Sequence, residues 1–231
     1  MTRDLGDARH PLRGTLGATS LSKLFYTDLM NTGTSVSPGI GGWDGSGGSV
    51  LAFQAASATE PLGFWRGTTP ANINDKARAI MRGTNVLNQG VFWTASFSGT
   101  LAMRFRLGQT TDCQFVVGLY QPVAAGGGSL TDKNGAYLRY DSATDTNFMY
   151  QNGTTAANAV SSGIAVDTNW HVLKLRYVSS TSVFYALDSG AETEVTVSTG
   201  SGSIAPAFAV MTTAAAAKTA DFSVVQMEIN V

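Results

Sequence analysis

Hydrophobic and polar residues alternate along several short segments of this chain, and the alternation predicts β-strands. Residues 101–107 read Leu-Ala-Met-Arg-Phe-Arg-Leu, residues 173–177 read Leu-Lys-Leu-Arg-Tyr, and residues 225–231 read Val-Gln-Met-Glu-Ile-Asn-Val. Because successive side chains of a strand point to opposite faces, each segment presents one apolar face and one polar face. Such segments are typical of antiparallel sheets that pack against a core on one side only.

Further strand-like segments follow one another in the second half of the chain, each closed by turn residues. They cover residues 136–141, 147–153, 169–177, 182–188 and 193–197. Short strands separated by turn signals at regular spacing are typical of a sandwich or a barrel. We therefore predict an all-β protein, an antiparallel β-sandwich of the jelly-roll type. A single domain over residues 49–231 is expected, because sandwiches of this length commonly fold as one unit.

The first 48 residues differ from the rest of the chain. Residues 21–30 carry apolar side chains near helical spacing, and residues 31–48 have the Gly- and Ser-rich composition of a linker. We predict that residues 1–48 form an extended N-terminal arm or anchor, since they are too few and too rich in glycine to hold a core. Residues 74–82 are compatible with one or two helical turns or with a strand, and both alternatives stay open.

Charge is scarce and evenly balanced. Charged residues make up 13% of the chain, about half of the roughly 25% usual in soluble globular proteins. A surface so poor in charge is typical where much of it faces other protein, or where small polar residues cover long antiparallel sheets. The net charge is −1, from 15 basic and 16 acidic residues scattered singly. Since no basic stripe is present to neutralise phosphates, we expect no nucleic-acid partner.

The sequence also bears on location. It contains no apolar run of roughly 18 residues or more, so we expect no membrane partner. The N-terminus reads Met-Thr-Arg-Asp-Leu-Gly-Asp-Ala-Arg-His-Pro and lacks the apolar core of a secretion signal. We therefore expect the protein to be made and assembled in a cytoplasm.

Cys113 is the only cysteine, which excludes an internal disulfide and a four-cysteine zinc site. It begins a strand-like segment in which positions 113, 115, 117 and 119 share one apolar face. No histidine lies nearby in sequence to activate the thiol. A buried structural thiol is therefore the favoured interpretation.

Residues 167–177, followed by residues 182–190, resemble the concanavalin A-like jelly rolls, nearest to laminin G and pentraxin-like modules. In that superfamily a Trp-His pair often opens a strand of alternating apolar residues, and here the pair is Trp170 and His171. A hairpin then leads to an aromatic strand and a Leu/Val-Asp/Asn-Gly turn, which departs slightly here to Leu-Asp-Ser-Gly. The resemblance covers roughly residues 90–231. It implies the jelly-roll fold and a framework role for Trp170 and His171, and it says little about function.

A second resemblance extends over the whole chain, to virion proteins of tailed bacteriophages. Many of these carry jelly rolls behind a short glycine-rich arm, in cysteine-poor chains rich in Thr, Ser, Ala and Gly. This resemblance implies a structural protein of a virion.

Catalytic groups are scarce. Glucanases with this fold are expected to place Glu-x-Asp-x-Glu on one strand. The nearest match, Glu192 and Glu194, lacks the central Asp and the third carboxylate, so solvated residues at a sheet edge are favoured. The two histidines, His10 and His171, stand far apart in sequence and mark neither a metal site nor a triad. We predict no catalytic residue, no metal site and no cofactor.

Calcium deserves separate consideration, because lectin relatives often bind it through loop carboxylates and carbonyls. Asp132, Asn134 and residues 141–147 supply oxygen atoms in loops. The same side chains are also those that tight turns require, and the turn interpretation is favoured. Asn152 begins an Asn-Gly-Thr glycosylation sequon, which we also interpret as a turn.

Trp43, Trp65 and Trp93 are candidate aromatics for a glycan or for a subunit interface. Trp65 and Trp93 each follow a phenylalanine, so one aromatic of each pair should point outward if the segment is extended. Interfaces are rich in aromatics and poor in lysine, and the chain has five lysines against ten arginines. The interface is therefore favoured over the glycan.

These observations lead to two functional hypotheses. The first is a non-enzymatic virion structural protein, a capsid decoration or cement protein that binds the major capsid protein or other virion proteins through its arm and subunit contacts. It would assemble as a homotrimer, in the cytoplasm of a host bacterium. The alternative is a carbohydrate-binding tail fibre or receptor-binding component that recognises a surface glycan. A glycosidase ranks third.

Overall fold

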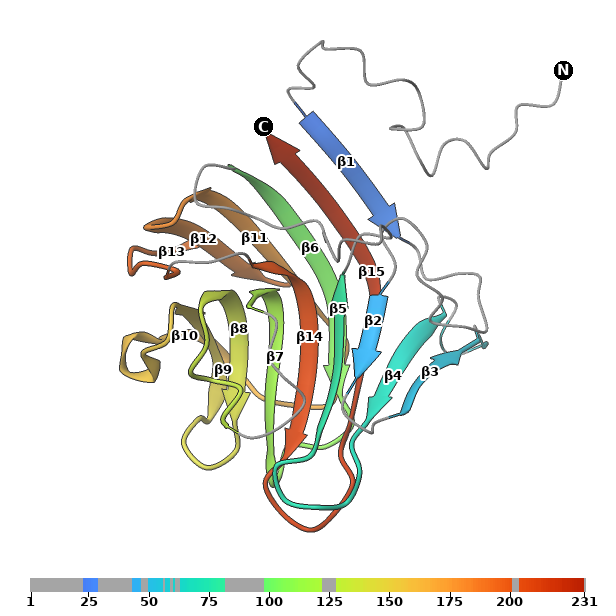
Figure 1. Ribbon diagram of the computed structural model, residues 1–231. Coiled ribbons are helices and arrows are strands. Elements are labelled where there is room, and N and C mark those ends of the chain that lie inside the picture. The colour runs from blue at the N-terminus through green and yellow to red at the C-terminus, as the bar shows by residue number, and fades with distance from the viewer. Residues whose placement is uncertain are drawn as a thin grey trace, which may run out of the picture.

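The protein is an antiparallel β-sandwich, as predicted: two sheets face each other across a common core (Figure 1). The computed structural model describes residues 23–28, 43–46, 50–55, 57, 58, 60, 63–81, 98–121, 128–200 and 204–230. Every strand pairing within the two sheets of this described part is antiparallel.

One sheet has eight strands. They are β1 (Lys23–Asp28), β3 (Val50–Gln54), β4 (Phe64–Thr68), β6 (Ser98–Leu107), β11 (His171–Ser179), β12 (Ser182–Leu187), β13 (Thr193–Val195) and β15 (Thr219–Asn230). Their order is β13-β12-β11-β6-β15-β4-β3, and β1 pairs with β15 beside this path. The long central strands β6 and β15 therefore hold the sheet together.

The other sheet has seven strands, in the order β10-β9-β8-β7-β14-β5-β2. They are β2 (Trp43–Ser46), β5 (Lys76–Met81), β7 (Cys113–Tyr120), β8 (Gly135–Asp141), β9 (Asn147–Asn152), β10 (Val160–Ala165) and β14 (Ala205–Thr212). A short 3₁₀ turn, η2 (Ala156–Asn158), joins β9 to β10. The series of strands predicted from residue 136 onward is thus divided between the sheets, because β8 and β9 belong here and β11 to β13 lie opposite.

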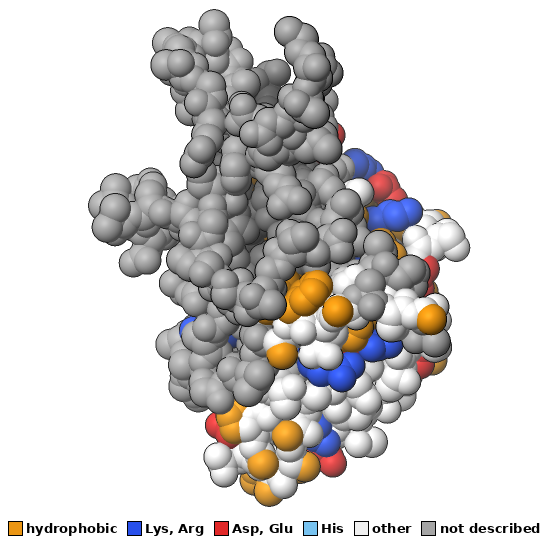
Figure 2. Space-filling model, turned by 90° about the vertical axis from the view of Figure 1, so that its right-hand side faces the viewer, with side chains coloured by type: hydrophobic (Ala, Val, Ile, Leu, Met, Phe, Trp, Pro, Cys, Tyr) orange, Lys and Arg blue, Asp and Glu red, His pale blue; other side chains and the backbone are white. Residues whose placement is uncertain are grey.

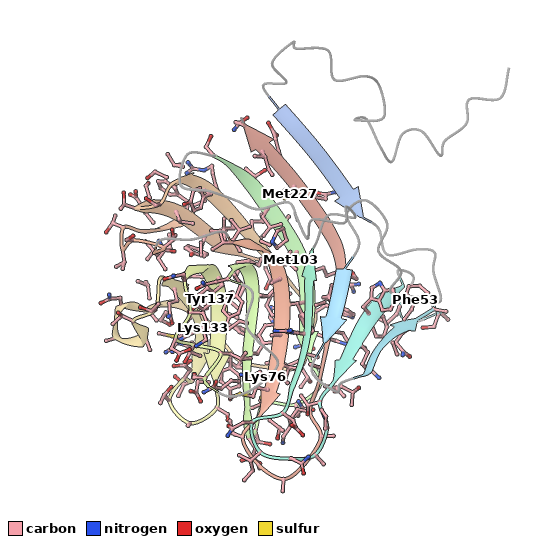
Figure 3. All side chains as sticks on the ribbon, in the orientation of Figure 1. Phe53, Lys76, Met103, Lys133, Tyr137 and Met227 are labelled. Carbon is pink, nitrogen blue, oxygen red and sulfur yellow. The ribbon has the colours of Figure 1, made fainter. Side chains whose placement is uncertain are left out.

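The core lies between the sheets and is built by the alternation that the sequence shows. Leu101, Met103, Phe105 and Leu107 all point inward from β6 and are buried, and Met227 does the same from the neighbouring strand β15 (Figure 3). Aromatic rings join the two layers at the centre of this core. The Phe105 ring of β6 stacks on that of Phe115 of β7, with 5.2 Å between the ring centroids.

Cys113 is buried in the same core, as predicted. Burial raises the pKa of its thiol to about 11. At neutral pH the group is therefore a protonated, small hydrophobic side chain rather than a thiolate.

The seven-stranded sheet is also covered on its outer side. A second apolar cluster there consists of Val116, Tyr120, Leu130, Tyr137, Ala205, Ala207, Ala209 and Met211. Part of its cover is the loop before β8. The hydroxyl of Tyr137, on β8, donates to the carbonyl of Lys133, 3.2 Å away, and Figure 3 shows the two residues next to each other. The strands β7 and β14 are consequently buried on both faces.

Two stretches of the predicted arm are strands. Residues 21–30 were expected to show helical spacing, but Lys23–Asp28 forms β1 and pairs with β15 from Asn230 to Val225. So short a segment does not sustain a helix by itself, and sheet pairing decides its conformation. Trp43–Ser46 forms β2 and pairs with β5. The remainder of residues 1–48 lies outside the described residues, so the arm and its boundary stay a prediction.

The ambiguous segment 74–82 is resolved as a strand. Asn74 has a positive φ of 69°, which asparagine tolerates in turns, and Lys76–Met81 then forms β5. Within the described part of the chain, no helix is long and apolar enough to cross a membrane.

Candidate functional site

The outward side of the eight-stranded sheet carries a continuous group of polar and charged side chains, and we call it the outer face. It is formed where β11, β6, β15 and β4 lie side by side. Its side chains alternate with the core residues of the same strands. They include Lys174, Arg176, Thr100, Ala102, Arg104, Arg106, Asp221, Ser223, Gln226, Glu228, Phe64 and Arg66.

A groove of about 550 Å³ runs across one half of the outer face. Thr100 and Ala102 of β6 form its floor. In the register of the sheet, Ala102 lies between Lys174 and Gln226, and Thr100 lies between Arg176 and Glu228. Short side chains on the middle strand are thus flanked by long ones on the strands to either side, roughly 10 Å apart across the sheet, which produces the hollow.

The other half of the outer face holds a group that we call the arginine–tryptophan cluster: Arg66, Arg104, Arg106, Trp170, Glu60 and Asp221. Asp221 lies at its base with 1% of its side chain exposed. It accepts hydrogen bonds from Arg66 Nε and Nη2 at 2.8 and 2.9 Å and from Arg106 Nε at 2.7 Å. One buried carboxylate thereby fixes guanidinium groups from the strands on both sides of it.

Trp170 is the aromatic centre of the cluster. The guanidinium carbons of Arg104 and Arg106 lie 3.7 and 4.6 Å from the centroid of its ring, within the range of cation–π attraction. The Phe64 ring meets the indole edge-on, 5.5 Å away between centroids. These contacts fix the plane of the indole on the outer face.

Glu60 completes the cluster from outside the sheet. Its carboxylate accepts hydrogen bonds from Arg104 Nη2 and Arg106 Nη1, both at 3.1 Å, and from the indole N–H of Trp170. Burial by itself raises the pKa of the Glu60 carboxyl. The hydrogen bonds from Trp170 and Arg104 and the charges of both arginines outweigh burial, so the pKa lies below its ordinary value. Glu60 is therefore a bound carboxylate anion at neutral pH.

His171 follows Trp170 in sequence but points to the opposite side, into the core. Its Nδ1 lies 2.8 Å from Oδ2 of Asp188, and its Nε2 lies 2.9 Å from Oδ1 of Asp167. Its ring packs edge-on against that of Phe148, 5.1 Å between centroids. Burial raises the pKa of Asp167, but hydrogen bonds from Asn169 and His171 lower it overall. His171 thus ties the turn before β11 to the turn after β12.

The structure corrects the interpretation of Trp65 as an aromatic platform. Trp65 is 9% exposed and lies in the core, where it meets Phe53 edge-on at 5.5 Å between centroids. The outward aromatic of the pair is Phe64, because it precedes Trp65 by one position in a strand. Of Trp43 only the backbone in β2 is described, and Trp93 lies outside the described residues. The aromatic that does occupy the outer face is Trp170, which the sequence marked only as part of a fold motif.

The candidate carboxylates of the sheet edge are engaged with neighbouring side chains. Glu192 pairs with Arg176, with 3.2 Å between Oε1 and Nε, and Glu194 accepts a hydrogen bond of 2.6 Å from Ser182. Both side chains lie at the exposed edge formed by β12 and β13, which confirms their interpretation as solvated edge residues.

The turn interpretation of the 141–147 loop is confirmed. Asp145 Oδ2 accepts a bond of 2.9 Å from the backbone N–H of Asp141, and Asp141 Oδ1 accepts one of 3.0 Å from the N–H of Ala143. Asp145 also pairs with Arg139, 3.0 Å from Nη2. Among the described residues, no group of three or more His, Cys, Asp or Glu side chains is arranged to hold a metal ion.

The sequon asparagine, Asn152, is fully buried and bonded within the fold. Its Nδ2 donates to the carbonyls of Val195 and Val197, at 2.8 and 2.9 Å. Gly153 follows with a φ of 70°, and a Cβ there would lie 2.4 Å from the carbonyl oxygen of Ser198. The sequon is thus a structural turn, and its amide is not accessible to glycosylation in the folded protein.

Comparison with solved structures places this architecture. SO2946 from Shewanella oneidensis MR-1, a protein of unknown function, superposes with a TM-score of 0.67 at 14% identity. The superposition covers 92% of the present chain and 88% of SO2946. The carbohydrate recognition domain of Emp47p gives 0.57 at 14% identity, covering 92% of the chain and 97% of that domain. Peanut lectin gives 0.52 at 13% identity, covering 90% and 97%. The sandwich has the concanavalin A-like fold.

No family model matches the chain, and no curated protein matches its sequence. At such low identities the likeness concerns the fold alone, which serves many unrelated functions. The comparison therefore confirms the concanavalin A-like fold that the Trp170–His171 region implied, while function has to be argued from the outer face itself.

Proposed function

We propose that this chain is a non-enzymatic binding protein and that a saccharide binds in the groove on its outer face. The observation that carries the proposal is the groove itself. Its volume of about 550 Å³ lies within the range of small-molecule sites. Its walls offer the side-chain amide of Gln226 and the ammonium group of Lys174, beside the ion pair of Arg176 and Glu192, whose outer polar atoms also border the groove. These groups supply both donors and acceptors for the hydroxyl groups of a sugar.

A binding role rather than a catalytic one is supported by how the chemically capable side chains are used. Cys113 is a buried thiol whose pKa burial raises to about 11. His171 is buried between two aspartates, and Glu192 and Glu194 are paired at the sheet edge. Each of these groups has a structural partner that accounts for its position.

Filling the groove tests the proposal. Ala102 lies in its floor and faces outward, so Ala102→Tyr adds bulk where a ligand would sit without entering the core. We expect this variant to keep its thermal stability and to lose at least tenfold in affinity for glycans that the wild type binds on a broad array, measured by calorimetry. Val178→Tyr is the matched control, since Val178 is 48% exposed on β11 and does not line the groove.

Two results would count against saccharide binding. The first is an Ala102→Tyr variant that binds as tightly as Val178→Tyr and the wild type. The second is the lack of any signal for the wild type on an array that includes bacterial surface glycans.

The virion structural hypothesis stays a second proposal, supported by the poverty of surface charge. On the face drawn in Figure 2, uncharged side chains and backbone predominate among the described atoms, and Lys and Arg occur in small groups. With five lysines against ten arginines, this composition suits subunit contacts. In this role the protein would bind the major capsid protein as a trimeric decoration protein within a virion.

A deletion tests that second proposal, and the structure sets where it must end. Since β1 begins at Lys23 and pairs with β15, removal of residues 1–22 leaves both sheets complete. We expect the truncated protein to keep its melting temperature and to stop co-sedimenting with capsids of the same virus. The molar mass measured by light scattering tests whether the protein is a trimer in solution. A truncated protein that still decorates capsids would refute an anchoring role for the arm.

A further inference from the structure

The donors around Glu60 form a site shaped for one carboxylate. They come from β6, through Arg104 and Arg106, and from the residue that precedes β11, Trp170. Glu60 itself belongs to neither strand and is 17% exposed. Its backbone N–H instead bonds with Ser57, at 3.1 Å to Oγ and 3.2 Å to the carbonyl oxygen. The donors of the pocket thus belong to the sheet and to the residue before β11, whereas Glu60, which fills the pocket, belongs to the separate turn formed with Ser57.

These donors are held in place by contacts that do not involve Glu60. Arg106 is bonded through Nε to Asp221, and Arg104 lies 3.4 Å from Ser223 Oγ through Nη1. Both guanidinium groups also stack on the Trp170 ring. A site whose donors are fixed in advance binds its ligand at a lower entropic cost. With Glu60 displaced, the three arginines of the cluster would face a single carboxylate, that of Asp221, which leaves an excess of positive charge.

The pocket and the groove adjoin each other on one strand. Arg104 follows Ala102 on the same face of β6, and residues two apart in a strand are separated by about 7 Å. A ligand seated over Thr100 and Ala102 would therefore reach Arg104 with its next group along the strand. The two halves of the outer face can act on one ligand.

We propose that the arginine–tryptophan cluster is a carboxylate-binding subsite, that Glu60 fills it in the free protein, and that acidic saccharides displace Glu60 from it. The proposal rests on the saccharide-binding function of the groove and narrows its ligand class to sugars carrying a carboxylate. Arg104, Arg106 and the indole N–H of Trp170 bind the ligand carboxylate, while the groove binds the adjoining sugar. Competition from Glu60 lowers the affinity of the free protein for such ligands.

Calorimetry with digalacturonate and with the matched neutral digalactoside tests this specificity. Glu60→Ala should bind digalacturonate at least tenfold more tightly than the wild type, with digalactoside affinity unchanged within about twofold. Adding Arg104→Gln should remove the gain. Glu194→Ala removes an equal charge from an exposed position outside the cluster and should leave both affinities unchanged. Thermal unfolding confirms that each variant folds.

The subsite can also be tested without a sugar. In Glu60→Ala, sodium acetate should shift the NMR resonance of the Trp170 indole N–H, assigned through Trp170→Phe, whereas sodium chloride at equal concentration should not. The shift should vanish when Arg104→Gln is added. An indole resonance that responds equally to acetate and chloride would overturn the subsite.

The outcomes separate the two proposals. Equal binding of both disaccharides by every variant would refute the acidic specificity and leave saccharide binding in place. An acetate response without binding of either disaccharide would refute the acidic-saccharide proposal together with saccharide binding in the groove, and would leave a pocket for some other carboxylate.

Discussion

Replacing Phe105 with alanine is expected to lower the free energy of unfolding by about 3–5 kcal/mol, the usual cost of removing a fully buried phenylalanine. Phe105 is 0% exposed and lies where the two sheets meet. Its ring stacks on Phe115 of β7 and meets Phe148 of β9 edge-on, with 5.2 and 5.6 Å between centroids. It also packs on His171, 5.8 Å away. The substitution leaves a cavity that strands on both sides cannot readily close.

Urea denaturation followed by tryptophan fluorescence measures the loss. The matched control is Phe184→Ala, because Phe184 lies half-buried on β12 beneath the guanidinium group of Arg176, 3.8 Å from its ring centroid. We expect that control to lose about 1 kcal/mol, since only part of the ring leaves an apolar environment. Equal losses in the two variants would show that Phe105 is not central to the contact between the sheets.

How far the sequence predicts this fold depends on which sheet is considered. On β6 and β11 one face is packed and the other is polar, so the alternation of residues 101–107 and 173–177 predicts both the strands and their inward side chains correctly. The strands β7 and β14 are buried on both faces, so their patterns do not alternate. The apolar face that positions 113, 115, 117 and 119 share does face the partner sheet, but the apolar cluster on the far side of the seven-stranded sheet was not predicted.

Two other strands were not predicted correctly, for different reasons. The strand β10 reads Val-Ser-Ser-Gly-Ile-Ala and lies at a sheet edge, where small polar residues suffice and little apolar signal is needed. The strand β1 was interpreted as helical because Leu24 and Phe25 fit helical spacing. Its conformation is decided by pairing with β15, some 200 positions away in the chain, which no local pattern encodes.

The candidate site shows the same division between local and non-local information. The sequence marked Trp170 only as part of a fold motif, and its place on the outer face was not predicted. Its partners were not predictable, because Glu60 lies 110 positions away in sequence and Asp221 meets Arg66 across 155 positions. Because Phe64 and Trp65 are adjacent in a strand, one of them must face outward, but the sequence does not indicate which one. The pairing of β4 with β15 places Phe64 on the outer face and Trp65 in the core.

The outer face also changes how the scarcity of charge is interpreted. Charged residues are only 13% of the chain, yet seven arginines, lysines and acids gather on β6, β11, β15 and β4 alone: Arg66, Arg104, Arg106, Lys174, Arg176, Asp221 and Glu228. The other side of this sheet is buried in the core, so all seven groups lie on the outer face. Their position beside a groove is the reason for proposing that this face binds a ligand.

Replacing Asn152 with alanine is the second substitution with a large expected effect, a loss of about 2–4 kcal/mol in the free energy of unfolding. Asn152 is 0% exposed at the end of β9, in the seven-stranded sheet. Its amide donates to the carbonyls of Val195 and Val197, in and beyond β13 of the opposite sheet, and its Oδ1 accepts from the Tyr185 hydroxyl. Alanine would remove the amide partner of both carbonyls, and loss of a partner by a buried polar group costs about 1–3 kcal/mol.

Asn147→Ala is the matched control, at the other end of the same strand. Its side chain makes one exposed bond, 3.0 Å from Nδ2 to Ser161 Oγ, so we expect a change within about 0.5 kcal/mol. In a domain of this size the loss at Asn152 corresponds to a fall of roughly 5–15 °C in melting temperature, measurable by calorimetry. Tyr185→Phe should retain more stability than Asn152→Ala, because it leaves both carbonyl bonds intact. If Asn152→Ala and Asn147→Ala have the same melting temperature, the Asn152 amide does not contribute to the contact between the sheets. The stability of the sandwich would then rest on its apolar core alone.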